Sequence, residues 1–144
     1  EIPVGAPGSQ PSTLGIALVA DETLNPGREG QANPLELQIV RLSEESRLLS
    51  ADYQQLRQDL AKALGKNYLD HQGLHDCALT PTGFRYLPNF PMDEQTRYLG
   101  VIAHYADPER AQWRQLIRID PLGHHYQLLV HLHSDRILLQ REEE

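Results

Sequence analysis

Histidine is the reactive residue type that stands out in this sequence, with seven copies in 144 residues. His131 and His133 lie two positions apart in an alternating apolar segment, so a β-strand would place both imidazoles on one face. A metal ion could bridge two such rings, but a specific site usually needs three or four ligands. Asp135 is the one acidic residue at ligand spacing from them. We therefore expect no metal and no cofactor, and keep a metal- or ligand-binding β-sandwich using surface histidines as the alternative function.

The other reactive groups give no indication of catalysis. A hydrolase needs a nucleophile with a base beside it. The sequence contains no G-x-S-x-G elbow, P-loop, G-x-G-x-x-G turn or H-E-x-x-H helix. Cys77 is the single cysteine, has no adjoining basic residue to activate its thiol, and is interpreted as a small buried residue. We expect a protein that is not an enzyme, with a hydrolytic sandwich as the least favoured function.

The charge of the chain restricts its partners. Its formal net charge is −7, so it gains nothing from the counterion release that drives binding to nucleic acid. The same charge is repelled by anionic lipid headgroups. No stretch approaches the roughly 18 apolar residues of a membrane-spanning helix. If the domain sits at a membrane, something other than its own surface must hold it there.

Short apolar segments separated by turns dominate the chain. Ten glycines and ten prolines are more than a helical bundle of this length would tolerate. The expected strands are residues 13–20, 35–42, 74–79, 84–87, 96–105, 113–119, 126–133 and 136–139. In the second of these, the alternation changes phase after Ile39, which predicts a bulge or a change of sheet. About seven to eight short strands with short connections predict an all-β fold, a two-sheet β-sandwich.

One helical insertion interrupts the strands at about residues 50–64. Apolar residues recur there at three- and four-residue spacing, which forms a single stripe that must pack on the sheet. The stripe consists of Tyr53, Leu56, Leu60 and Leu64. Ser50 is expected to cap the start of this helix and Gly65 to end it.

Both ends of the chain are expected to lie outside the folded domain. Residues 1–12 contain three prolines and two glycines without apolar periodicity, which predicts a flexible tether. Residues 141–144 are expected to be an acidic disordered end. The β-sandwich domain would then span residues 13–140.

The loop of residues 21–33, with the sequence DETLNPGREGQAN, is the strongest candidate for recognition. Loops held on a rigid sandwich commonly carry binding residues. Pro26 and Pro34 restrict its freedom, which reduces the entropy lost on binding. Arg28 and Glu29 offer charged contacts. The other interpretation is a variable surface loop without function.

The stretch from Leu24 to Leu42 resembles the outer-membrane lipoprotein family of type VI secretion systems, the TssJ (SciN/VasD-like) family. The shared pattern is Leu-Asn-Pro, a glycine-containing loop, a proline and an alternating strand that ends in leucine. The matching positions are Leu24, Asn25, Pro26, Gly30, Pro34 and Leu42. Three further segments agree in order and spacing: Ala51-Asp52-Tyr53 with Leu56, Tyr98 to Ala103, and Trp113-Arg114.

This resemblance implies a transthyretin-like β-sandwich with a helical addition and a structural role in the secretion membrane complex. It implies a domain on the periplasmic face of the outer membrane that binds the periplasmic C-terminal domain of TssM. An N-terminal lipid anchor would tether it through an acylated cysteine. That cysteine is absent from this chain, because Cys77 lies inside the domain, and is expected to precede Glu1.

The resemblance also implies that the loop between the first two strands contacts the partner. The expected partner-binding residues are Leu24, Asn25, Pro26, Gly27, Arg28, Glu29, Gly30 and Gln31.

Overall fold

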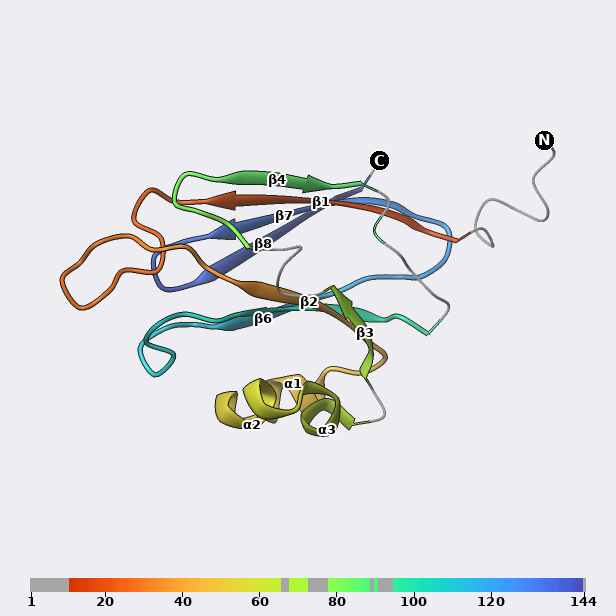
Figure 1. Cartoon of the computed structure of the whole chain (residues 1–144). Coiled ribbons are helices and arrows are strands. Elements are labelled where there is room, and N and C mark those ends of the chain that lie inside the picture. Colours follow the sequence, from red (N-terminus) through yellow and green to blue (C-terminus); the bar gives the residue numbers. More distant parts are fainter. Residues whose placement is uncertain (1–10, 66–67, 73–77, 89, 91–94, 144) are drawn as a thin grey trace.

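The computed structural model describes residues 11–65, 68–72, 78–88, 90 and 95–143. These residues form two four-stranded sheets that stack face to face, with three short helices on the outer side of one sheet (Figure 1). The predicted all-β fold, a two-sheet sandwich with a helical insertion, is confirmed. Cys77 lies outside the described residues, so its predicted burial stays a prediction.

The two sheets are built from strands that are mostly distant in sequence. The first has the order β4-β1-β7-β8: β4 (Phe84–Leu87), β1 (Thr13–Ala20), β7 (His125–Leu132) and β8 (Ile137–Glu143). The second has the order β3-β2-β5-β6: β3 (Tyr68–Gln72), β2 (Leu37–Leu42), β5 (Tyr98–Ala103) and β6 (Arg114–Arg118). Strands β1 and β7 pair in parallel, and the other pairs among the described strands are antiparallel.

Strand β2 is buried on both faces. Leu37 and Ile39 belong to the main core between the sheets, whereas Val40 and Leu42 belong to a second core beneath the helices. The apolar residues after Ile39 therefore do not mark a change of sheet. They face the helical layer, which covers the side of the strand that water would otherwise reach. A register irregularity is present only against β3, between Arg41 and Leu42.

The single helix expected over residues 50–64 is three helices in the structure. They are α1 (Ser46–Ser50), α2 (Tyr53–Gln58) and α3 (Leu60–Leu64). Asp52 and Asp59 have extended backbones, which break the helix. Each aspartate then caps the helix that follows, as the usual preference for aspartate at this position predicts. Among the described residues, no helix has the length and apolar character needed to cross a membrane.

The ends of the sandwich extend beyond the predicted boundaries. Strand β8 continues to Glu143, so residues 141–143 are a strand and not a disordered end. Their charged side chains are exposed on an edge strand, where charge opposes pairing with other chains. At the start, Pro11 already bridges Leu122 and Ser12 is buried. The rest of the predicted tether, residues 1–10, lies outside the described residues, as does Glu144.

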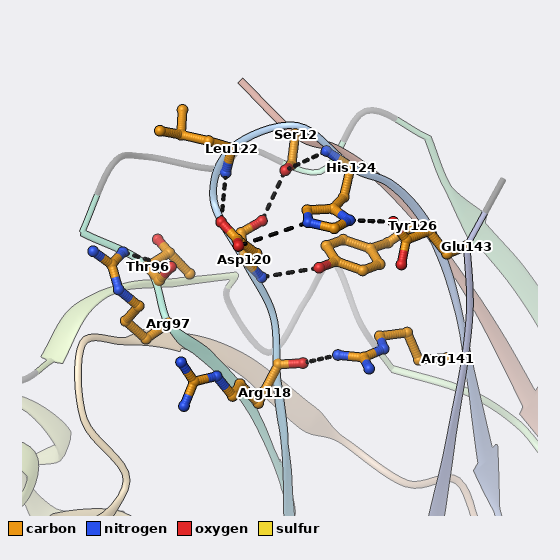
Figure 2. A network of polar contacts seen from close by, with 10 residues as sticks. All are labelled: Ser12, Thr96, Arg97, Arg118, Asp120, Leu122, His124, Tyr126, Arg141 and Glu143. Carbon is orange, nitrogen blue, oxygen red and sulfur yellow. Dashed lines mark hydrogen bonds and ion pairs between the residues drawn. The ribbon is translucent and has the colours of Figure 1, made fainter. Parts of the chain in front are cut away.

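A polar network around Asp120 fixes the point where the chain enters β1 (Figure 2). The Ser12 hydroxyl donates to the Asp120 carbonyl at 2.7 Å, and its oxygen accepts from the His124 backbone N–H at 3.1 Å. The Asp120 backbone N–H donates to the Tyr126 hydroxyl at 3.1 Å, and the His124 ring contacts Glu143. The chain therefore joins the sandwich at a defined place, at the end where β1 begins.

Two differences concern the segment after the helices. Strand β3 was not predicted, and residues 74–77 of the strand expected at 74–79 lie outside the described residues. Leu79 is described, and it forms an isolated β-bridge with Leu35. This bridge holds the residues just after the 21–33 loop against the turn that precedes β4.

Candidate partner-binding loop

The loop of residues 21–33 connects the two sheets and projects beyond their ends (Figure 1). It leaves β1 at the end opposite to Ser12. Its first residue is fixed by backbone hydrogen bonds, because the Asp21 N–H donates to the Leu132 carbonyl at 3.0 Å and the Thr82 N–H donates to the Asp21 carbonyl at 3.2 Å. The base of the loop is thereby held to β7 and to the turn before β4.

Leu24 and Asn25 point into the protein. The Leu24 side chain is fully buried in the main core. The Asn25 amide nitrogen donates to the Pro34 carbonyl at 2.9 Å, and its amide oxygen accepts from the Ala106 N–H at 2.8 Å. Its backbone is left-handed, with φ 49°, a conformation that asparagine tolerates better than most residues. Together the two side chains attach the loop to the sandwich.

The tip of the loop is closed by its own hydrogen bonds. The Gly27 N–H donates to the Gln31 carbonyl at 2.9 Å, and the Gly30 N–H donates to the Gly27 carbonyl at 3.0 Å. Gly30 has φ 83°, which glycine adopts without steric cost. The Asn33 amide nitrogen donates to the carbonyls of Asn25 and Gln31 at 3.1 and 3.2 Å. The tip is therefore a pre-shaped turn.

The structure divides the eight predicted partner-binding residues into two groups. Leu24 and Asn25 are buried and anchor the loop to the sandwich. Their contact with the partner stays a prediction. Gly27 is half-buried. The exposed residues are Pro26, Arg28, Glu29, Gly30 and Gln31, and for these the prediction of partner contact stays a prediction.

A hollow of about 210 Å³ lies beside the base of the loop. Its walls come from three separate segments: Asn25 and Pro26 of the loop, residues 105–111 between β5 and β6, and the Ser134–Asp135 turn. Asp107 and Arg110 on its rim form an ion pair at 3.6 Å. Sequence reasoning missed this surface, because none of the three segments carries a pattern that indicates their proximity.

His131 and His133 lie side by side at the root of the loop, on one face as predicted. Their rings stack with centroids 4.0 Å apart. His131 Nε2 and His133 Nδ1 each lie 2.7 Å from one oxygen of the Asp21 carboxylate. The acidic neighbour is thus Asp21, and not Asp135, whose carboxylate faces Arg136. Spacing could not reveal this residue, because Asp21 and His131 are 110 positions apart.

The environment of Asp21 acts on its pKa in two directions. Partial burial raises the pKa of the carboxyl, but the hydrogen bonds and positive charge of His131 and His133 outweigh this effect. The pKa of Asp21 therefore lies below its ordinary value, and the carboxylate is ionised over a wider range of pH than an isolated aspartate.

Comparison with known proteins agrees with the fold. Residues 12–135 match the family model described as "Type VI secretion lipoprotein, VasD, EvfM, TssJ". The crystal structure of the T6SS lipoprotein TssJ1 from Pseudomonas aeruginosa has a TM-score of 0.83 and 32% identity, over 92% of this chain and 97% of that chain. No curated protein matches the sequence.

Two further structures share the fold at lower identity. Serratia marcescens Lip, a membrane-bound component of the type VI secretion system, has a TM-score of 0.75 and 21% identity, over 93% of this chain and 99% of that chain. A chain from the structure of the T6SS protein TssM C-terminal domain from EAEC has a TM-score of 0.71 and 22% identity, over 89% and 97%.

Asn25→Ala should destabilise the domain by roughly 2–4 kcal/mol. The estimate combines about 1–3 kcal/mol for the two hydrogen bonds lost to the Ala106 N–H and the Pro34 carbonyl with about 1 kcal/mol for alanine in a left-handed conformation. Urea unfolding followed by circular dichroism measures the change. Arg28→Ala, at the exposed tip, is the matched control and should stay within about 0.5 kcal/mol of the parent. Equal stability of the two variants would contradict the anchoring role of Asn25.

Asp21→Asn should lower stability at neutral pH, and its effect should fade in acid. A carboxyl whose folded-state pKa is depressed stabilises the fold above its unfolded pKa, about 3.9, and this contribution is lost as the pH falls through the folded pKa. Unfolding free energies of the parent and the variant, measured from pH 7 down to pH 3, should therefore begin to converge below about pH 4. A difference that stays constant over this range would show that the charge of Asp21 contributes nothing.

Proposed function

The chain belongs to the type VI secretion lipoprotein family, and from this premise we propose that it is a structural subunit of the secretion membrane complex and not an enzyme. In this proposal it is tethered to the outer membrane, faces the periplasm and binds the periplasmic C-terminal domain of TssM. The observation that carries the proposal is the loop of residues 21–33, which is closed by its own backbone hydrogen bonds and projects from the two-sheet sandwich.

The positions of the chain entry and the loop support a bridging role. Strand β1 begins directly after Ser12, which is hydrogen-bonded to Asp120, and ends directly before Asp21. Its eight residues span about 26 Å at about 3.3 Å per residue. The N-terminal segment and the loop therefore leave the sandwich at opposite ends. A lipid anchor that precedes the domain would leave the loop directed away from the membrane, toward a partner in the periplasm.

The physical character of the loop tip suits recognition of a protein. Its backbone is held in shape by hydrogen bonds, so binding does not have to order it. Arg28 and Glu29 are exposed there and offer one charge of each sign, while Pro26 borders the hollow beside the loop. TssM is favoured as the partner because a chain with this fold occurs in the structure described as the TssM C-terminal domain.

The double variant Arg28→Ala/Glu29→Ala should weaken binding of the TssM C-terminal domain by about tenfold or more. Truncation of a hot-spot residue costs about 2 kcal/mol or more, and 1.4 kcal/mol corresponds to tenfold. The matched control is Gln58→Ala/Lys62→Ala, at exposed positions of α2 and α3. Surface plasmon resonance gives both affinities, and circular dichroism confirms that both variants fold. Parent-like affinity of the loop variant would remove the tip from the interface.

Lipid anchoring is tested in cells that express the full-length gene product. The proposal expects incorporation of labelled palmitate and recovery in the outer-membrane fraction. Both should be lost when the acylated cysteine preceding this domain is replaced by serine, because the acidic domain surface has no electrostatic attraction to anionic lipid. A protein that stays in the outer-membrane fraction without acylation would contradict the tether.

A further inference from the structure

We propose that Asp21, His131 and His133 form a binding site for a divalent transition-metal ion of the zinc class. The proposal is independent of partner binding, because it concerns the root of the 21–33 loop and not its exposed tip. The carboxylate and the two imidazoles offer three donor atoms that all lie within 4.8 Å of one another.

The separations of these atoms are close to those of a metal site. Each ring nitrogen lies 2.7 Å from a carboxylate oxygen in the hydrogen-bonded state. Around a tetrahedral ion with metal–ligand distances near 2.0–2.2 Å, neighbouring ligand atoms are about 3.3–3.5 Å apart. Each aspartate–histidine separation would therefore have to lengthen by less than about 1 Å to match this spacing, and the two ring nitrogens lie within 4.8 Å of one another.

The types of ligand select the class of ion. Imidazole nitrogen suits zinc, copper and nickel, whereas calcium and magnesium prefer sites made of oxygen. The side chains keep 26–35% of their surface exposed, so an ion can enter and water can complete the coordination. Three protein ligands and an open fourth position form a common arrangement for zinc. The ionised carboxylate adds the negative charge that favours a divalent cation.

The three side chains are held by rigid elements. His131 lies in β7, and His133 follows directly after the last residue of that strand. Val19 of β1 pairs in register with His131. The Asp21 N–H donates to the Leu132 carbonyl, which lies between the two histidines in the sequence. The Tyr105 hydroxyl donates to the His133 carbonyl at 2.9 Å. Paired strands therefore position the ligands before any ion arrives, as an effective site requires.

The second nitrogen of His133 determines how tightly an ion would be held. His133 Nδ1 faces Asp21, while Nε2 is buried without a hydrogen-bond partner in the described part of the chain. Coordination through Nδ1 places the ring proton on Nε2, where it finds no acceptor. Metal-bound histidines usually have such an acceptor, and its absence weakens the site. We therefore expect an ion that exchanges readily with solution.

Isothermal titration calorimetry of the tag-free chain with zinc chloride tests the proposal. One ion should bind per chain, with a rise in the thermal midpoint. Asp21→Asn, His131→Gln and His133→Gln should each weaken binding by at least about tenfold, since even outer-shell partners of metal ligands contribute 10–100-fold. The control is His125→Gln, which changes an exposed histidine at the far end of the same strand and should bind like the parent.

Circular dichroism monitors the folding of all four variants. If Asp21→Asn folds poorly, His131→Gln and His133→Gln still test the site. Cobalt(II) provides a second readout, because the proposed site should give a visible absorption band that His131→Gln and His133→Gln abolish. The proposal is overturned if millimolar zinc produces neither heat nor a thermal shift. It is equally overturned if the three ligand variants bind like the parent, or if only His125→Gln loses binding.

Discussion

Burial of one face of β1 against the opposite sheet is the constraint on which the other features depend. Leu14, Ile16 and Leu18 are at most 2% exposed, and each such side chain contributes about 1.5–3 kcal/mol relative to an exposed one. Because side chains on a strand alternate, this burial fixes which residues of β1 face outward. Hydrogen bonds of Ser12 and Asp21 fix the two ends of the strand, where the chain enters the domain and where the 21–33 loop begins.

Contacts with the sandwich hold the 21–33 loop in one conformation, although its composition alone would favour many. Glycine, proline and asparagine would favour many conformations in isolation. Here Leu24 inserts into the core, Asn25 bonds to two distant backbone groups, and the backbone of Gly27 closes the tip. Buried anchoring residues and exposed tip residues thus lie within one short motif.

Local patterns were sufficient to predict most strands, because alternation on one face is a property of neighbouring residues. The alternation from Tyr126 to His133 predicted β7 and placed His131 and His133 together. Two local features were misread: Asp52 and Asp59 break the predicted helix, although both are residues that commonly begin one.

The features that were missed arise from contacts between distant parts of the chain. Asp21 meets His131 only because β1 and β7 pair in parallel, which nothing in either segment specifies. Asn25 is polar and lies in a loop, and no local pattern indicates that it is buried. Its burial follows from the Ala106 N–H and the Pro34 carbonyl, which it alone satisfies among the side-chain contacts described. The phase change in β2 likewise needed the helical layer for its explanation.

We propose that the end of the sandwich carrying the 21–33 loop, and no other face, meets the partner. Chemical-shift mapping of the ¹⁵N-labelled chain, titrated with the unlabelled TssM C-terminal domain, locates the contact surface residue by residue. We expect perturbations to concentrate in residues 26–31 and in the adjoining segments 105–111 and 134–135. Perturbations centred on the helical layer, or on the Asp120 turn at the opposite end, would contradict it.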